Sequence, residues 1–210
     1  EKRTQTLFRF AFAHALCYHA PVMGTLTEIR WHGRGGQGVK TACEFVAVVA
    51  IHSGKYGQGF PEYGPERSGA PMKGFTRISS DKIREHCSIY HPTVILVLDE
   101  SLIGPEDVCE GLAEGGSVII NTKNNASAFA GLCRGRIWTV DATTIALDEI
   151  GRPIPNMPMV GALLKVTGVL GVEELIAGVT REFSRKFDQK TIDGNLRAIR
   201  RAYAEVKCDG

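Results

Sequence analysis

The sequence predicts an α/β fold: a mostly parallel, doubly wound sheet with helices on both faces and a helical C-terminal region. Three observations support this class. Strand and helix patterns alternate from Thr27 onward, and a continuous apolar run from Val94 to Leu98 indicates a central strand covered on both faces. Residues 156–207 carry helical patterns throughout.

The first half of the chain contains three expected elements before that central strand. Residues 27–32 form a short strand candidate that ends in glycines. Residues 39–53 place apolar side chains at helical spacing, and Gly54 is a natural C-terminal stop, so we expect a buried helix. Residues 72–79 alternate well enough to predict a strand.

The second half begins with an expected helix at Pro105, because a proline followed by acidic residues favours a first helical turn. The segments GGSVIINT and GRIWTVDAT predict two further strands, each ending in polar residues. Helices are then expected over residues 141–151, 156–170 (started by Pro158), 172–187 and 194–207.

Composition excludes several partners. The formal net charge of +2 is too near neutral to suggest a nucleic-acid binder, which needs a concentrated basic face, and no apolar run reaches the roughly 18 residues of a membrane span. We therefore expect no nucleic-acid and no membrane partner. The six cysteines are far apart and form no C-x-x-C pair, which predicts no metal or iron–sulfur site on this chain and reduced thiols in the cytoplasm.

The domain organisation is expected to be simple. Residues 1–22 have a basic start and an apolar middle, but charged and histidine side chains interrupt that middle and no A-x-A site follows. We interpret residues 1–22 as an N-terminal extension outside the natural fold. Residues 23–210 show no repeat and no linker, so they are expected to form one domain.

A glycine loop lies between the first expected strand and helix. Its anion-binding candidates are Gly33, Arg34, Gly35, Gly36, Gln37 and Gly38. Backbone N–H groups of such a turn, beside the positive end of a helix dipole, accept an anion such as phosphate. Arg34 and Lys40 add charge, and the Gln37 amide can bind a neutral polar group. Close packing of strand on helix is the structural alternative.

The spacing also fits G-x-G-x-x-G, the dinucleotide-binding fingerprint. That site needs an acidic residue about 20 positions further on, to bind the adenosine ribose. No acid stands there, and Glu62 arrives late in a loop. A free-standing NAD(P)-dependent oxidoreductase is therefore the runner-up interpretation.

A second loop follows, rich in glycine and proline, where regular structure is not expected over about ten residues. Long ordered loops of this kind are usually functional. Its ligand-binding candidates combine an aromatic ring, an acid, a guanidinium, a hydroxyl and glycines: Tyr63, Gly64, Glu66, Arg67, Ser68 and Gly69. A plain surface loop with a Glu–Arg pair is the alternative.

Three segments in register carry a family resemblance: IRWHGRGGQG, FPEYGPERSGAP and IPNMPMVGAL. In this order and spacing they resemble the gamma subunit of 2-oxoacid:ferredoxin oxidoreductases, most closely the pyruvate enzymes. The resemblance runs from about Glu28 to Cys208. It implies a subunit of a thiamine-dependent complex that converts a 2-oxoacid and coenzyme A into acyl-CoA and carbon dioxide, with electrons passed to ferredoxin.

The resemblance also implies how the work is divided. Thiamine diphosphate, Mg²⁺ and [4Fe–4S] clusters are expected on alpha, beta and ferredoxin-like delta subunits, since this chain carries neither a thiamine signature nor a cysteine cluster. This chain is expected to bind no cofactor alone, to supply no catalytic residue, and to help bind coenzyme A at the active-site entrance. A homodimer of the isolated chain is a further expectation, and a purely structural assembly subunit is the third interpretation.

Polar residues also follow three expected strands. Asp99, Asn121 and Asp141 stand where ligands collect in open parallel sheets, but such residues also cap helices. Capping is favoured for Asn121 and Asp141, while both interpretations stay open for Asp99. His32 is expected to be a hydrogen-bonded structural histidine. Met157 and Met159 fit either a core or an interface.

Overall fold

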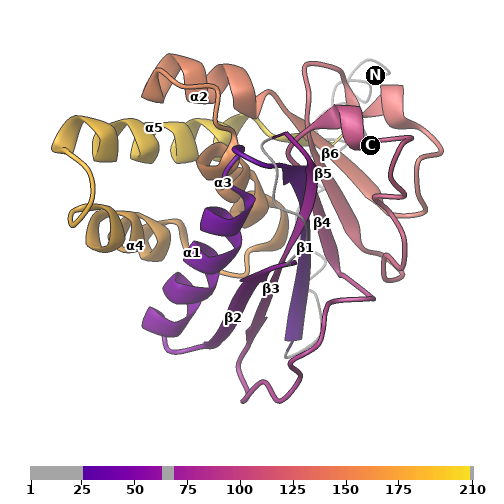
Figure 1. The fold of residues 1–210 in the computed structure, drawn as a ribbon, viewed down its shortest axis with the longest axis horizontal. Helices are drawn as coiled ribbons and strands as arrows, with labels where there is room; N and C mark the ends of the chain where they lie inside the picture. The colour runs from indigo at the N-terminus through magenta and orange to yellow at the C-terminus, as the bar shows by residue number, and fades with distance from the viewer. Residues whose placement is uncertain (1–25, 63–68, 209–210) are drawn as a thin grey trace, which may run out of the picture.

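The computed structural model describes residues 26–62 and 69–208 and has a single seven-stranded sheet at its centre (Figure 1). The strand order is β2-β3-β1-β4-β5-β6-β7. Strands β1, β4, β5 and β6 pair in parallel, whereas β3 is antiparallel to both β1 and β2, and β7 is antiparallel to β6. Five strands therefore share one direction, which confirms the mostly parallel sheet.

The chain enters the sheet through β1 (Leu26–Arg34) and leaves it through α1 (Val39–His52). Apolar residues dominate one side of α1 and much of the rest, so the helix is buried against the sheet as expected. Gly54 follows the C-cap with φ +79°, the left-handed conformation of a helix stop.

Strand β2 (Tyr56–Pro61) is an edge strand that the sequence pattern did not predict, and it pairs with the expected strand β3 (Pro71–Ser79). Gly57 and Gly59 give β2 little strand character in sequence. Both are needed because β2 lies directly on α1: a Cβ on Gly57 would stand 2.4 Å from the carbonyl oxygen of Ala47, and one on Gly59 2.3 Å from that of Cys43.

The parallel half of the sheet agrees with the sequence pattern. It consists of β4 (Val94–Val97), β5 (Ser117–Asn121) and β6 (Arg136–Val140), and the short β7 (Lys207–Cys208) extends its edge. Every residue of β4 and β5 is buried, which explains the continuous apolar run of β4 and the apolar centre of β5.

Four helices follow the sheet. They are α2 (Ala142–Ile150), α3 (Asn156–Thr167), α4 (Val172–Phe183) and α5 (Gln189–Glu205). Helix α3 begins two residues before Pro158, because a proline in the first turn loses no hydrogen bond. Helix α5 begins earlier than predicted, at the side-chain cap that Asp188 provides to the N–H of Thr191.

The two faces of the sheet are covered unequally. All five α-helices pack on one face, over one large core that includes Trp31, Leu96 and Met157 (Figure 1). The opposite face is covered by a smaller core under the 3-10 helices η1 (Glu100–Leu102) and η2 (Ala126–Phe129) and under loops. Helices thus lie on both faces, but one face has only 3-10 turns.

The expected helix at Pro105 is absent from the described residues, and this prediction was wrong. The connection from β4 to β5 contains Gly104 and Gly111, both with positive φ, and a bridge pairs Ile103 with Glu106. These turns interrupt the segment before a helical turn is complete. Met157 and Met159 are both core residues, which settles that alternative in favour of packing.

Two buried arginines attach loops to the face of the sheet that carries only 3-10 helices and loops, which we call the helix-poor face. Arg77 of β3 pairs with Glu28 at 2.8 Å and donates to the carbonyl oxygen of Cys87. Nε of Arg30 in β1 donates to Nε2 of His32 at 3.0 Å. Nη2 of Arg30 donates to the carbonyl oxygens of Val108 and Glu110. The loops therefore obtain from charge-assisted bonds the anchoring that a helix obtains from its apolar side.

His32 is fully buried, hydrogen-bonded and neutral, as a structural histidine should be. Burial lowers its pKa to about 3, and the positive charges of Arg30 and Lys73 act in the same direction.

Substituting Gly57 by alanine should force β2 away from α1, since its Cβ would meet backbone rather than a movable side chain. We expect the free energy of unfolding to fall by about 1–3 kcal/mol, measured by urea denaturation. Gly171→Ala is the matched control, because its Cβ would touch nothing closer than 3.4 Å. Equal stability of the two variants would contradict the close packing of β2 on α1.

Stability should also fall as the pH is lowered from 7 to 5. The unfolded chain protonates His32 below about pH 6.5, whereas the folded chain does not until about pH 3, so acid favours the unfolded state. This residue alone should remove about 2 kcal/mol by pH 5. His32→Gln cannot titrate and should show a correspondingly flatter dependence in denaturation at both pH values. Parallel pH profiles would refute the neutral, buried state of His32.

Candidate functional site

The glycine loop connects β1 to α1 and packs against the start of α3. Gly38 is the N-cap of α1, with φ +81°, and it provides no side-chain cap. Asn156 of α3 lies so close that a Cβ on Gly38 would stand 2.3 Å from its Nδ2, and Nδ2 donates to the carbonyl oxygen of Gly38 at 3.4 Å. Segments 118 residues apart in sequence therefore meet here.

The end of the second loop is bound to the glycine loop through backbone groups. The N–H of Gly35 donates to the carbonyl oxygen of Ala70 at 2.9 Å, and the N–H of Gly69 donates to that of Gly35 at 3.1 Å. Arg34 donates to the carbonyl oxygen of Gly69 at 3.1 Å. The remaining candidates of that loop, Tyr63, Gly64, Glu66, Arg67 and Ser68, lie outside the described residues.

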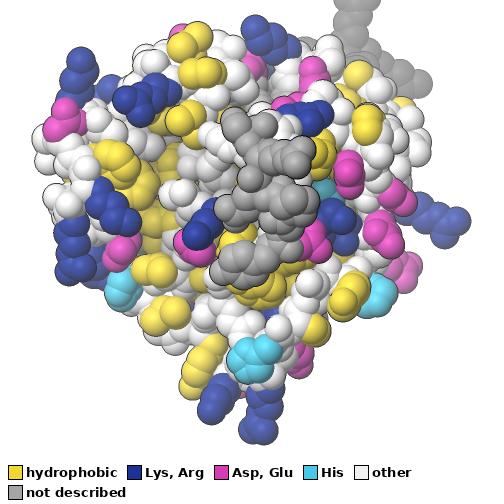
Figure 2. Space-filling view, in the orientation of Figure 1, with side chains coloured by type: hydrophobic (Ala, Val, Ile, Leu, Met, Phe, Trp, Pro, Cys, Tyr) yellow, Lys and Arg dark blue, Asp and Glu magenta, His cyan; other side chains and the backbone are white. Residues whose placement is uncertain are grey.

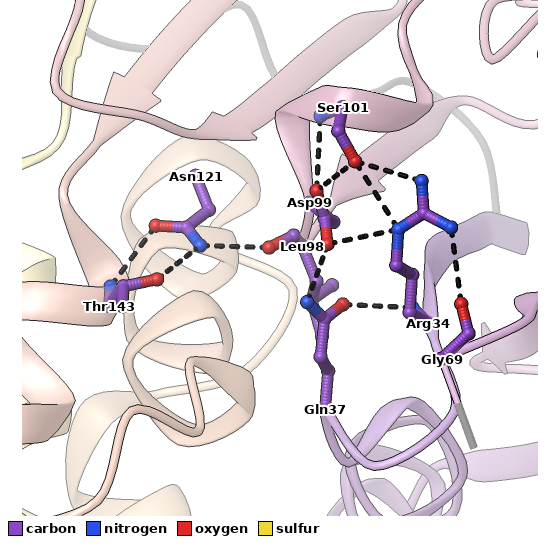
Figure 3. A network of polar contacts seen from close by, with 8 residues as sticks. All are labelled: Arg34, Gln37, Gly69, Leu98, Asp99, Ser101, Asn121 and Thr143. Atoms are coloured by element: carbon purple, nitrogen blue, oxygen red, sulfur yellow. Dashed lines mark hydrogen bonds and ion pairs between the residues drawn. The ribbon is translucent and has the colours of Figure 1, made fainter. Parts of the chain in front are cut away.

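Side chains fix the conformation of the glycine loop (Figure 3). Oε1 of Gln37 accepts from the N–H of Arg34 at 2.8 Å, while its Nε2 donates to Oδ2 of Asp99 at 2.7 Å. Nε of Arg34 lies 3.3 Å from the same carboxylate oxygen, and Nη2 of Arg34 donates to Oγ of Ser101 at 2.9 Å. Gln37 thus serves the loop itself, and its polar atoms are already engaged.

Asp99 is the centre of this network, and of the two roles left open for it the structure shows the capping role. It caps η1, because its Oδ1 accepts from the N–H of Ser101 at 3.0 Å. Partial burial raises its pKa, but hydrogen bonds from Ser101 and Gln37 and the charge of Arg34 outweigh burial, so the pKa is lowered overall. The carboxylate remains ionised and holds the ends of β1 and β4 together.

Asn121 and Asp141 perform the structural roles expected of them. Oδ1 of Asp141 accepts from the N–H of Thr144 at 3.0 Å and caps α2. Asn121 accepts from the N–H of Thr143 at 3.1 Å and donates to the carbonyl oxygen of Leu98 at 2.8 Å (Figure 3). Both residues therefore anchor strand ends and are already hydrogen-bonded.

The loop lies at a topological switch point of the sheet. The connection after β1 passes over the helix-covered face, whereas the connection after its neighbour β4 passes over the opposite face. In open α/β sheets ligands bind in the crevice that such a divergence creates, beyond the carboxyl ends of the strands. Helix α1 begins at this loop, and its first turn has neither a side-chain cap nor an acidic residue, which leaves the positive end of the helix uncompensated there.

A cleft of about 890 Å³ opens on the helix-covered side of the loop; we call it the helix-side cleft. Gly36, Gly38 and Thr41 form one wall, and residues of α2, α3, α4 and α5 and their connections form the others. Figure 2 shows hydrophobic side chains over the α4 and α5 side of this face, with charged side chains around them. The cleft has the size of a site for a nucleotide-sized ligand.

The lining of the cleft contributes residues that sequence reasoning missed. Arg152 and Lys190 are exposed cations for which no described residue provides an ion-pair partner, and the ring of Phe187 is 48% exposed. Glu149 at the rim is already paired with Arg197 at 2.8 Å. No sequence signal marked this set, because Arg152 comes from the α2–α3 connection and Phe187 and Lys190 from around the start of α5, and only packing brings these two segments to the glycine loop.

The topology also tests the dinucleotide interpretation. A Rossmann site has a second parallel strand directly beside the first, with an acid at its end. Here the antiparallel strand β3 separates β1 from β2, and Glu62 follows β2 two strands away from the glycine loop. The glycine spacing therefore lacks the strand arrangement that dinucleotide binding requires.

Neither a metal centre nor a membrane-spanning helix is found among the described residues. They contain no group of three or more histidine, cysteine or acidic side chains arranged to hold a metal ion. None of the helices in the same ranges combines the length and hydropathy that a membrane span requires. No disulfide bond joins the cysteines within those ranges.

Known proteins resemble this chain along almost its whole length. Residues 28–205 match the family described as pyruvate ferredoxin/flavodoxin oxidoreductase. Pyruvate synthase subunit PorC of Thermotoga maritima is 47% identical over 190 residues, covering 90% of this chain and 98% of that protein. The common gamma subunit of the pyruvate and ketoisovalerate oxidoreductases of Thermococcus litoralis is 42% identical and covers 86% of this chain and 97% of that protein.

Solved structures give the same assignment. The crystal structure of the Thermotoga maritima subunit PORC matches with a TM-score of 0.79 and 44% identity, covering 89% of this chain and 100% of that one. A keto/oxoacid ferredoxin oxidoreductase gamma subunit from Geobacter sulfurreducens, 22% identical with a TM-score of 0.69, shares the fold and covers 87% of this chain and 97% of its own. The chain therefore belongs to the pyruvate ferredoxin/flavodoxin oxidoreductase family, as a gamma-type subunit of a 2-oxoacid:ferredoxin oxidoreductase.

Proposed function

We propose that this subunit binds coenzyme A for a complex that converts a 2-oxoacid, pyruvate foremost, into acyl-CoA and carbon dioxide and passes the electrons to ferredoxin. One observation carries the proposal. The three segments of the family resemblance converge at the switch point of the sheet, where Gly35 bonds to Ala70 and Gly38 packs on Asn156. A cleft of cofactor size opens beside them.

The nucleotide half of coenzyme A fits the helix-side cleft. Its phosphates need N–H donors and cations, which the first turn of α1, Lys40, Arg152 and Lys190 supply. Its adenine needs an apolar or aromatic surface, which Phe187 offers. The second-loop candidates Tyr63, Gly64, Glu66, Arg67, Ser68 and Gly69 complete the proposed site on the basis of the family resemblance.

The comparisons support this assignment from two directions. A 2-oxoglutarate:ferredoxin oxidoreductase from Magnetococcus marinus, which shares the fold at 18% identity and a TM-score of 0.69, was solved with coenzyme A bound. The name of the Thermococcus litoralis relative states that one gamma subunit is common to a pyruvate and a ketoisovalerate oxidoreductase. A shared subunit fits a role in binding coenzyme A, the substrate that both reactions would use, with the choice of 2-oxoacid made on other chains.

The remaining chemistry is assigned to partner subunits. We propose that thiamine diphosphate with Mg²⁺ and the [4Fe–4S] clusters are held by alpha, beta and ferredoxin-like delta subunits, with ferredoxin as the electron acceptor. The contribution of this chain is to hold and orient coenzyme A beside the reacting centre and to exclude water there. The lack of a disulfide among the described cysteines fits assembly in the cytoplasm, and a homodimer is the form we propose for the isolated chain.

Arg152→Ala should weaken binding of coenzyme A to the assembled complex about five- to tenfold, because one charge-assisted phosphate contact is lost. Isothermal titration calorimetry at fixed ionic strength measures this change. Arg185→Ala is the matched control, since it removes an exposed arginine that lies outside the cleft lining. Equal dissociation constants for both variants would remove the helix-side cleft from the coenzyme A site.

The purified chain alone should show no pyruvate-dependent reduction of ferredoxin and no reduction of NAD(P)⁺. Activity should appear only when the co-purifying subunits are added, together with thiamine and iron detected by analysis of the complex. Turnover of a soluble nicotinamide by the isolated chain would instead support the dinucleotide interpretation and overturn the proposed division of roles.

A further inference from the structure

A second, smaller pocket lies on the helix-poor face beside the glycine loop; we call it the His32 pocket. Its volume is about 170 Å³. It is lined by His32, Glu62, Pro71, Met72, Lys73, Leu102 and Glu106. This volume is below that of sites for whole cofactors, so the pocket suits one arm of a larger ligand.

The base of the pocket presents a hydrogen-bond donor whose identity the structure fixes. Nε of Arg30 donates to Nε2 of His32 at 3.0 Å, and because a guanidinium can only donate, Nε2 must be the unprotonated nitrogen. The neutral ring therefore carries its proton on Nδ1. His32 is 2% exposed and lines the pocket, and its only side-chain hydrogen bond to a described residue is the one at Nε2. Among the described residues, Nδ1 is not one of the fully buried polar atoms that lack a partner, so it keeps access to solvent. A donor of this kind at the wall of a pocket can bond to an acceptor group of a ligand that enters it.

The rim of the pocket provides acceptors. Glu62 and Glu106 contribute carboxylates that no described residue pairs, and Lys73 contributes one ammonium group. With the buried guanidinium of Arg30 behind His32, two negative charges face two positive charges, so the pocket has no net positive charge to attract a phosphate or a free carboxylate. A neutral group that carries both an acceptor and a donor is favoured instead. Pro71, Met72 and Leu102 add apolar surface for the carbon atoms next to such a group.

The pocket lies next to the glycine loop, because residues adjacent in sequence to its lining contact that loop. Arg30, His32 and Arg34 alternate along β1, so their side chains point to the same face of the sheet. Pro71 directly follows Ala70, which accepts from Gly35, and Leu102 directly follows Ser101, which accepts from Arg34. A ligand held at the loop is therefore one residue away from two walls of the pocket.

We propose that the His32 pocket binds an amide of the pantetheine arm of coenzyme A. Nδ1–H of His32 donates to the amide carbonyl oxygen, and a rim carboxylate accepts from the amide N–H. The proposal rests on the proposed function, because it places the arm on one side of the loop that holds the phosphates and the nucleotide on the other. It extends that function by naming His32 and Glu106 as residues that position the arm.

Two half-ligands separate the arm from the nucleotide: pantetheine and adenosine 3′,5′-bisphosphate. Each is tested as a competitive inhibitor against coenzyme A in the assembled complex. His32→Phe and Glu106→Ala should each raise the inhibition constant of pantetheine about five- to tenfold and leave that of the bisphosphate unchanged. Arg152→Ala should have the opposite selectivity. Glu114→Ala, an exposed carboxylate on the same connection as Glu106, is the control that should change neither constant.

The outcomes distinguish this inference from the function on which it rests. If pantetheine binds the Glu106→Ala and His32→Phe complexes as it binds the unchanged complex, while Arg152→Ala still weakens the bisphosphate, the pocket holds solvent and only the arm assignment fails. If Arg152→Ala also leaves the bisphosphate unaffected, the coenzyme A site itself is elsewhere. Should His32→Phe fail to assemble because Arg30 loses its acceptor, Glu106→Ala decides the question alone.

Discussion

The carboxylate of Asp99 is the constraint on which the site depends. It stands at the end of β4 and receives hydrogen bonds from Gln37 and Ser101, with the guanidinium of Arg34 3.3 Å away. Gln37 and Arg34 belong to a loop whose glycines would otherwise permit many conformations. One ionised group therefore converts a flexible turn into a fixed one and sets the direction in which the N–H groups of α1 point.

That fixed turn lies between the helix-side cleft and the His32 pocket because successive side chains of β1 point to opposite faces of the sheet. Gly33 faces the helix-covered side, where Val39 leaves no room for a Cβ. His32 and Arg34 face the other side, where loops are attached by Arg30 and Arg77 instead of a helix. The helix-side cleft provides cations and an aromatic ring, while the His32 pocket provides a neutral donor and carboxylates. A molecule with an anionic half and a neutral amide-bearing half matches this pair.

Much of the fold could be predicted because its signals are local. The apolar run of β4, the helical spacing of α1 and the polar ends of the strands depend on neighbours in sequence. Strand β2 was not predicted because its glycines give it little strand character. Gly57 and Gly59 are required by close contact with the backbone of α1, which the local sequence pattern does not show. The helix expected at Pro105 failed for a related reason: its capping signals were present, but glycine turns and the bond from Arg30 hold that segment in another conformation.

The sequence alone determined the family, the position of the glycine loop and the absence of close cysteine pairs, because each of these is written in residue order and spacing. The tertiary structure decided which residues share a site. Arg152, Lys190 and Phe187 meet the glycine loop only through the packing of helices, and Nδ1 of His32 became a free donor only because Arg30 occupies its other nitrogen. Contacts between distant segments carry no local sequence signal, so only the folded chain could show them.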